Sequence, residues 1–359
     1  MKLSGWSLIL GFALAAAGSP LAAPEMMLNG RAAISTEMLA TLKLYSQYAG
    51  ASYCNSEKVV GSTVTCIQNA CPDVTAAGAK ITATYKGSRT DIRGFVSTDA
   101  KNKVIVVSIR GSHSVRNWIT DLRFLQKDCT LVSGCKVHTG FATAWDEISA
   151  TVLSAVKAAR AANPTYKIVF TGHSLGAAVS SLGAAYARKE GLPVDIINYG
   201  SPRVGNEAFA TFVSNQAGDE WRVTHLNDPV PRLPPAWLPL YSLKYAHTTP
   251  EYWLSNGSPM KIDYNVSDIT VCTGVKSFDC SARLTNIANV QSHLYYLNNI
   301  TACSPTEFVL REAAVDDYLW WEGTSPPKNL TDAELAQQLL DWARQDVEMA
   351  AARINGSSF

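Results

Sequence analysis

The sequence lacks the features of several common classes of protein. Its 31 lysines and arginines are balanced by 30 aspartates and glutamates, so the net charge is +1 and there is no basic excess for binding nucleic acid. After residue 23 no stretch is apolar enough to cross a membrane. Cys-x-x-Cys pairs and closely spaced histidines, the usual zinc ligands, are also missing. We therefore expect no nucleic-acid partner, no stable membrane span, no metal and no organic cofactor.

The beginning of the chain is typical of an exported protein. A cationic start at Lys2 precedes an apolar run from Trp6 to Ala17 that is too short to serve as a membrane anchor. Small residues follow as far as Ala23, so we predict a signal peptide within residues 1–23, cleaved at about 17–23. The alternative, a buried first helix, is disfavoured by the abrupt change to polar sequence afterwards. The mature protein is expected to be secreted and extracellular.

Eight cysteines in an exported chain indicate four disulfides. Short spacings make three local pairs plausible and leave a fourth pair that closes a very long loop: Cys66 with Cys71, Cys129 with Cys135, Cys272 with Cys280, and Cys54 with Cys303. Acceptor sequences for N-glycosylation fit the same secreted class. They lie at Asn256, Asn265, Asn299, Asn329 and Asn355.

Apolar strand patterns alternate with helical patterns along most of the chain. The predicted strands are 103–110, 166–171, 194–199 and 220–226, and the predicted helices are 32–52, 141–162, 176–189 and 207–216. This alternation predicts an α/β fold with a mostly parallel central sheet flanked by helices on both faces. The character changes after Cys303, where a capping box at Thr331–Glu334 opens a helix to about Arg353. We therefore divide the chain into a domain over 32–303 and a C-terminal extension over 304–359.

The segment Gly172-His173-Ser174-Leu175-Gly176 matches a nucleophile elbow, in which a serine occupies a strained turn between a strand and a helix. The five-residue pattern alone is weak, and a glycine-rich turn without chemistry is the simpler interpretation. A predicted strand leads into this segment and a predicted helix leads out, as the elbow requires. The context therefore favours an α/β-hydrolase fold with Ser174 as its nucleophile.

A serine nucleophile needs a histidine base and a carboxylate that orients that base. In this fold the order along the chain is serine, acid, histidine. Asp228 follows a predicted strand within a proline-rich loop that would hold its carboxylate in place. An ordinary turn before Pro229 is the structural alternative. We predict that Asp228 is the acid.

Three histidines follow Ser174. His225 precedes the acid and is excluded by the chain order. His247 lies in a predicted strand, Tyr245–Thr249, where a structural hydrogen-bonding role is the default. His293 begins a predicted apolar helix shortly before a cysteine that would anchor it. We predict that His293 is the base.

The oxyanion of an acyl-transfer intermediate needs backbone donors from the residue after the nucleophile and from an earlier loop. Leu175 and Ser112 occupy these positions. Directly after Ser112, apolar residues at Val115, Trp118, Ile119 and Leu122 have helical spacing. Periodicity alone favours a surface helix packed on the core, whereas the position beside the oxyanion loop favours a lid that turns toward lipid.

Four segments together resemble the secreted lipases of filamentous fungi, the class 3 lipase family, and the resemblance covers about 35–303. They are Arg110–Trp118, Thr171–Gly176, Tyr199–Gly205 and Asn227–Pro234. The resemblance implies a triad of Ser174, Asp228 and His293, an oxyanion hole at Ser112 and Leu175, and a lid tryptophan at Trp118. It also supports the cysteine pairs, and the tail is similar to the extensions of Fusarium-type lipases.

These observations predict a carboxylic-ester hydrolase, most simply a triacylglycerol lipase that acts at an oil–water interface through an acyl-enzyme. Phospholipase A1 and feruloyl esterase are alternatives on the same scaffold. Feruloyl esterases are expected to have a polar lid without tryptophan, so Val115, Trp118 and Ile119 favour lipid. A non-catalytic protein on this scaffold would need a damaged triad, whereas every residue of the triad is present. We expect a monomer whose partner is its lipid ester substrate.

Overall fold

The computed structural model describes residues 34–112, 119, 124–238, 243–287, 289–304 and 330–354. The predicted signal peptide lies outside the described residues. Of the predicted lid residues, Ile119 is described, whereas Val115 and Trp118 also lie outside. None of the helices within the described ranges combines the length and the apolar character that a membrane span requires.

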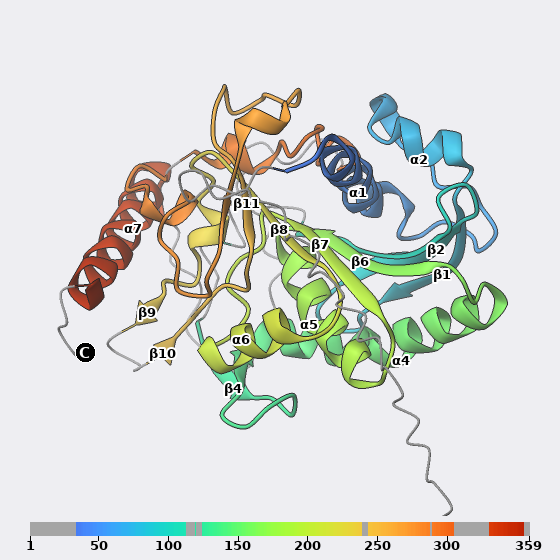
Figure 1. The fold of residues 1–359 in the computed structure, drawn as a ribbon, viewed down its shortest axis with the longest axis horizontal. Helices are drawn as coiled ribbons and strands as arrows, with labels where there is room; N and C mark the ends of the chain where they lie inside the picture. The colour runs from blue at the N-terminus through green and yellow to red at the C-terminus, as the bar shows by residue number, and fades with distance from the viewer. Residues whose placement is uncertain are drawn as a thin grey trace, which may run out of the picture.

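A sheet of eight strands forms the centre of the described structure (Figure 1). Its strands are β1 (Lys80–Lys86), β2 (Arg93–Asp99), β3 (Val104–Ile109), β6 (Lys167–His173), β7 (Val194–Tyr199), β8 (Glu220–His225), β11 (Glu251–Leu254) and β12 (Ile269–Cys272). They lie side by side in the order β1-β2-β3-β6-β7-β8-β11-β12. From β3 to β11 the neighbours are parallel, and antiparallel pairs occur at both edges. The mostly parallel α/β-hydrolase sheet predicted from sequence is confirmed.

Helices cover both faces of this sheet, and Figure 1 shows α1 on one side with α4, α5 and α6 on the other. The helices are α1 (Thr36–Asn55), α2 (Pro72–Ala77), α4 (Thr139–Ala162), α5 (Leu175–Lys189), α6 (Glu207–Asn215) and α7 (Asp332–Ile354). Successive residues of a strand point to opposite faces. Val106 of β3 accordingly packs in the cluster formed with α1, and Val107 packs in the cluster formed with α4 and α5. The buried strands read as continuous apolar runs because both faces are covered.

Short elements complete the fold outside the sheet. Two-stranded pairs are formed by β4 (Gln126–Asp128) with β5 (Lys136–His138) and by β9 (Trp237–Leu238) with β10 (Leu243–Lys244). The 3-10 helices are η1 (Ile67–Asn69), η2 (Val230–Arg232), η4 (Val266–Asp268), η5 (Ser281–Arg283) and η6 (Val290–His293).

Two local predictions were wrong. Tyr245–Thr249 is not a strand, since its pairing is limited to an isolated bridge between Ala246 and Gly205, and Pro250 separates it from β11. His293 ends η6 and does not open a helix. The apolar residues after it turn back on themselves, because Leu297 has a φ of 62° and Tyr295 bridges to Asn299.

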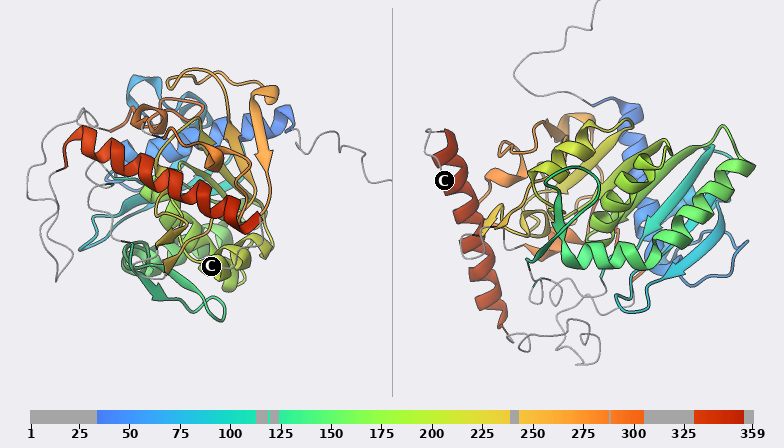
Figure 2. Two further views of the ribbon diagram at one scale, coloured as in Figure 1. Left: turned by 90° about the vertical axis from the view of Figure 1, so that its left-hand side faces the viewer. Right: turned by 90° about the horizontal axis from the view of Figure 1, so that it is seen from below.

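Helix α7 of the C-terminal extension lies against the body of the protein (Figure 2). Its apolar residues recur at every fourth position and form one stripe, as expected for a helix that buries one face. This stripe packs on residues from the predicted lid, from the loop after Asp228 and from the segment before His293. The cluster contains Leu335, Leu339, Ala343, Ile119, Val230, Leu233 and Ile287.

The eight cysteines form the four disulfides expected above. Cys54 at the end of α1 joins Cys303, 249 residues later and ten residues after His293. The other three bridges close loops of 5, 6 and 8 residues. The long-range bridge therefore ties the segment that carries His293 to the helix covering one face of the sheet.

Candidate active site

Ser174 occupies the turn between β6 and α5 in a strained conformation. Its φ of 58° and ψ of −127° lie in a region that residues other than glycine rarely adopt. The Ser174 amide donates a hydrogen bond to the carbonyl of Tyr199, 3.0 Å away. A β-carbon at position 176 would lie 2.1 Å from the carbonyl oxygen of Ile109, and one at position 172 would lie 2.5 Å from the backbone of Gly176. The two glycines of the motif are thus required by close backbone packing.

Asp228 and His293 meet in the buried interior next to this turn. Nδ1 of His293 donates to Oδ2 of Asp228 at 2.7 Å, and both side chains are almost fully buried. The amide of Val230 donates to Oδ1 of the same carboxylate at 2.8 Å, and the hydroxyl of Tyr296 donates to Oδ2. Because a carboxylate can only accept, the proton of the neutral imidazole lies on Nδ1. Nε2 of His293 therefore presents a lone pair.

The two atoms that a proton transfer would join are both available. Oγ of Ser174 and Nε2 of His293 are buried, and neither has a hydrogen-bond partner among the residues that the structure describes. Such hydrogen bonds are often long in ligand-free sites and tighten in the reacting complex. The pair can therefore act as nucleophile and base without first breaking another contact.

His173, the residue before the nucleophile, connects several parts of the site. Its Nε2 lies 2.8 Å from the carbonyl of His293, to which it donates, and its Nδ1 accepts from the hydroxyl of Tyr53 at 2.8 Å. Tyr53 itself accepts from the amide of Gly111. Burial and the neighbouring His293 hold the pKa of His173 well below its ordinary value, so it stays neutral. No sequence motif indicated Tyr53, which α1 brings to the site.

The two histidines after Ser174 that were not predicted as the base have structural hydrogen bonds. Nδ1 of His225 donates to the carbonyl of Ser292 at 2.8 Å, and Nε2 of His247 lies 2.5 Å from the carbonyl of Pro231. Burial lowers the pKa of both imidazoles, and nearby arginines lower that of His247 further. His173 and His225 thus hold two consecutive carbonyls, those of residues 293 and 292, and fix the backbone of the candidate base.

The two predicted oxyanion residues lie at the same end of neighbouring strands. Leu175 is the first residue of α5, so its amide has no partner within the helix. Half-buried Ser112 follows the end of β3 by three residues. Strands β3 and β6 are parallel and pair Ile109 with Gly172, which brings both residues to the carboxyl edge of the sheet. Open α/β sheets place ligands at this edge.

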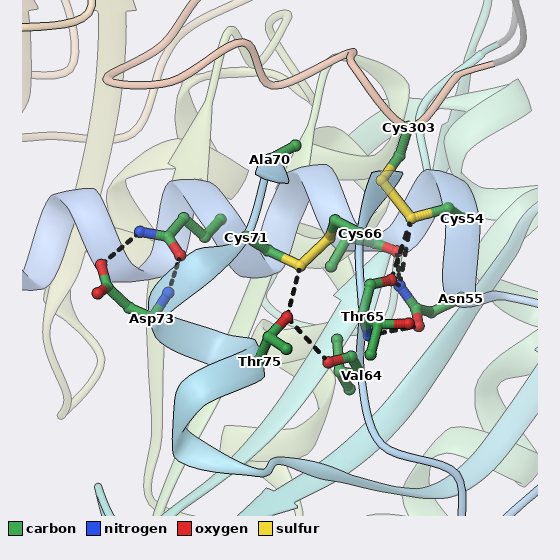
Figure 3. The surroundings of a disulfide bond; sticks show 12 residues. Cys54, Asn55, Val64, Thr65, Cys66, Ala70, Cys71, Asp73, Thr75 and Cys303 are labelled. Carbon is green, nitrogen blue, oxygen red and sulfur yellow. Dashed lines mark hydrogen bonds between the residues drawn. A yellow bond between two sulfur atoms is a disulfide. The ribbon is translucent and has the colours of Figure 1, made fainter. Parts of the chain in front are cut away.

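Among the described residues, the one close group of metal-type ligands consists of Cys54, Cys66 and Cys303. Figure 3 shows that their sulfur atoms belong to two neighbouring disulfides, Cys54–Cys303 and Cys66–Cys71. Asn55, next to Cys54, also joins the segments of the two disulfides, because its side-chain amide nitrogen donates to the carbonyl of Thr65, next to Cys66, at 2.9 Å. A disulfide sulfur is not a thiolate, so this cluster has a structural role.

Known proteins share this architecture. Residues 106–237 match the family model "Lipase (class 3)". A secreted mono- and diacylglycerol lipase of Fusarium solani is 43% identical over 344 residues, covering 95% of this chain and 96% of its own. The solved mono- and diacylglycerol lipase of Aspergillus oryzae is 37% identical, with a TM-score of 0.69, over 75% of this chain and 100% of its own. A solved triacylglycerol lipase, whose catalytic centre is described as a serine protease triad, is 34% identical with a TM-score of 0.66, over 77% and 100% of the two chains.

Proposed function

The chain belongs to the class 3 lipase family, and from this membership we propose that it is an extracellular triacylglycerol lipase that cleaves glyceride esters at an oil–water interface. The observation that carries the proposal is the hydrogen bond of 2.7 Å between Asp228 and His293 beside a serine in the strained elbow conformation. The prediction of a secreted protein is confirmed, since the related lipases of Fusarium and Penicillium are named as secreted.

The geometry supports an acyl-enzyme mechanism. Oγ of Ser174 attacks the ester carbonyl while Nε2 of His293 takes the hydroxyl proton, and Asp228 stabilises the resulting imidazolium. The backbone amides of Ser112 and Leu175 stabilise the oxyanion. His293 then donates its proton to the departing glyceride alkoxide. Water, deprotonated by the same imidazole, releases the fatty acid and restores the serine.

A second candidate has narrower specificity. The Fusarium solani relative, which matches nearly the whole chain, is named for mono- and diacylglycerols and not for triacylglycerols. A preference for partial glycerides is therefore the main competitor within the family, ahead of the phospholipase A1 and feruloyl esterase alternatives. The same nucleophile and base would serve all of these esters.

Further parts of the proposal concern segments and properties beyond the triad. We propose removal of a signal peptide within 1–23, a catalytic domain over 32–303 with a C-terminal extension over 304–359, and a monomeric protein. The lid assignment of Val115, Trp118 and Ile119 also remains a proposal. Ile119 is buried in the apolar cluster that also contains residues of the loop after Asp228 and of α7.

The decisive experiment measures hydrolysis against concentration for a short-chain triglyceride, through its solubility limit. Matched diglyceride, phosphatidylcholine and methyl ferulate are assayed in parallel. A lidded triacylglycerol lipase would show a jump in hydrolysis rate when droplets form. Ser174→Ala would reduce the turnover by about a million-fold and so abolish this jump. Cleavage of the diglyceride alone would establish the narrower candidate. Smooth saturation with strong ferulate cleavage would reject the lipase proposal.

A further inference from the structure

The loop between β11 and β12 reaches the segment of the candidate base through two buried side chains. Strands β8 and β11 are parallel and pair His225 with Leu254, so the loop after β11 begins at the same edge of the sheet as the loop that carries Asp228. The loop after β11 contains Tyr264, which is 2% exposed. The hydroxyl oxygen of Tyr264 lies 2.9 Å from Nε2 of His225, and Nδ1 of the same imidazole lies 2.8 Å from the carbonyl oxygen of Ser292. This chain of hydrogen bonds ends at the residue before the candidate base.

The partners of His225 determine which of its two nitrogens carries the proton. The carbonyl of Ser292 can only accept, so Nδ1 of His225 must be protonated. Burial lowers the pKa of His225, so the imidazole is neutral at about pH 7 and Nε2 has a lone pair. The opposite tautomer would place two lone pairs 2.8 Å apart, one on Nδ1 and one on the carbonyl of Ser292. Nε2 of His225 therefore needs a donor, which Tyr264 supplies.

The hydroxyl of Tyr264 has one proton and two acceptors within reach. Besides Nε2 of His225, the carbonyl oxygen of Asn256 lies 3.0 Å away. If the proton went to Asn256, the oxygen of Tyr264 could only accept from His225, which would then need a proton on each nitrogen. Burial disfavours that charged imidazole. The hydroxyl of Tyr264 thus donates to His225.

Charged contacts within the loop hold Tyr264 in place. Nζ of Lys261 lies 4.4 Å from the centre of the Tyr264 ring and 3.0 Å from Oδ2 of Asp268. Asp268 also accepts from Nδ2 of Asn256 at 2.7 Å and from the amide of Asn265 at 3.1 Å. These hydrogen bonds, of which that from Asn256 has the largest effect, lower the pKa of Asp268 to about 2. The carboxylate therefore stays ionised at neutral pH and keeps the loop closed around Tyr264.

We propose that Tyr264 is a positioning residue for the candidate base. Its hydroxyl fixes the imidazole of His225 with the Nδ1 proton toward Ser292, and this contact fixes the backbone that carries His293. Consecutive hydrogen bonds of this kind strengthen one another, so the donor at Nε2 also strengthens the bond to Ser292. Misplacing a catalytic group by about 1 Å can reduce turnover about a hundredfold, which makes kcat sensitive to such a contact. This role rests on the proposed function, in which His293 is the base.

The first test compares two variants that each remove one buried tyrosine hydroxyl. With a soluble nitrophenyl ester as substrate, Tyr264→Phe should lower kcat roughly tenfold with little change in KM. Tyr48→Phe is the control, because its hydroxyl donates to buried Asp99 at 2.8 Å and should leave kcat unchanged. Equal values of kcat in the two variants would overturn the positioning role. Activity that persists in Ser174→Ala would instead reject the proposed function.

A double-mutant cycle tests the route of the effect. His225→Asn has no atom in place of Nε2, so in this background Tyr264→Phe should cause no further loss of kcat. A second loss of about tenfold would show that Tyr264 acts independently of His225, and would overturn the proposal.

Nuclear magnetic resonance of protein labelled with ¹⁵N-histidine tests the contact without any need for activity, and so separates this inference from the proposed function. We expect the proton of His225 to lie on Nδ1 and to exchange with solvent at least tenfold faster in Tyr264→Phe than in Tyr48→Phe. Equal exchange in these two variants would overturn the role of Tyr264. If Tyr264→Phe does not fold, the unmodified protein decides, since a proton on Nε2 of His225 would contradict the proposed arrangement and a proton on Nδ1 would support it.

Discussion

At the scale of single residues, buried neutral side chains determine where the candidate base lies. His173 and His225 each donate to a backbone carbonyl of the segment 292–293, and Tyr296 donates to the carboxylate that orients the imidazole. None of these groups would exchange a proton in the proposed reaction. These groups hold the imidazole in its orientation. Their hydrogen bonds are stronger in low-dielectric surroundings than they would be in water.

Tyr53 tests this positioning role. Tyr53→Phe removes the hydroxyl that donates to His173 and accepts from Gly111. We expect kcat on a soluble ester to fall roughly tenfold with little change in KM, the effect of about one buried hydrogen bond. Tyr48→Phe is the matched control, because its hydroxyl also lies on α1 and bonds Asp99, which is not part of the candidate site. Equal losses of kcat in both variants would mean that Tyr53 acts through stability alone.

Glu220 predicts a pH dependence of stability. Burial raises the pKa of Glu220 from 4.5 to about 7. Between these two pH values the folded state keeps a proton on this carboxyl that the unfolded state has released. Its contribution to stability is complete below pH 4.5 and is lost as the pH rises through about 7. We expect Glu220→Gln to be more stable than the unmodified protein by up to about 3 kcal/mol at pH 8 and similar to it at pH 4.5. Chemical unfolding at the two pH values measures this difference.

The control for Glu220 is Glu190→Gln, which affects an exposed pair with Lys157. Surface pairs contribute about 0–1 kcal/mol, so this variant should show little difference between the two pH values. A constant effect of Glu220→Gln across the range would contradict the raised pKa.

At the scale of elements, α7 is held by the ionic contacts of Asp346 with Arg203 and Arg232 as well as by its apolar stripe. Asp346 is 1% exposed, pairs with Arg203 and accepts from the amide of Ala236 at 2.7 Å. Trp342 also packs edge-on against Phe124, with 5.2 Å between ring centroids. The helix of the C-terminal extension is therefore packed into the body, next to the loop that carries Asp228.

Asp346→Asn should release this helix. Removing one partner of a buried ion pair costs about 3–5 kcal/mol, since the other charge stays buried. We expect a lower Tm and faster proteolytic cleavage within α7 in the full-length protein. Asp341→Asn is the control, because Asp341 lies on the same helix but is 58% exposed beside Arg344. Protection of α7 that is unchanged in Asp346→Asn would show that the apolar stripe suffices.

At the scale of the whole molecule, the bridge Cys54–Cys303 constrains almost the entire described domain. It closes 249 residues, whereas Cys66–Cys71 closes 5, although the two bridges are neighbours in space. In the chain-entropy model a longer loop gives a larger stabilisation, because more freedom is removed from the unfolded chain.

The two bridges allow a direct comparison. Replacing Cys54 and Cys303 by serine should lower the free energy of unfolding by about 5 kcal/mol, and replacing Cys66 and Cys71 by about 2 kcal/mol. Denaturant unfolding of both double variants measures the contrast. Equal losses would show that strain or local packing, and not loop length, decides the contribution of each bridge.

Local pattern by itself determined the α/β alternation, the elbow around Ser174 and the three short-range cysteine pairs, whereas Asp228 and His293 were predicted from the chain order of the fold. Each of these features depends on residues that are close together in the chain or on the order of residues along it, and both can be read from the sequence. Only the tertiary structure placed Tyr53 beside His173, aligned His225 with Ser292, and brought Asp346 to Arg203 from 143 residues away. Single hydrogen bonds and ion pairs across such separations leave no periodic signal. They are set by how the helices pack on the sheet, and this packing creates the candidate catalytic site.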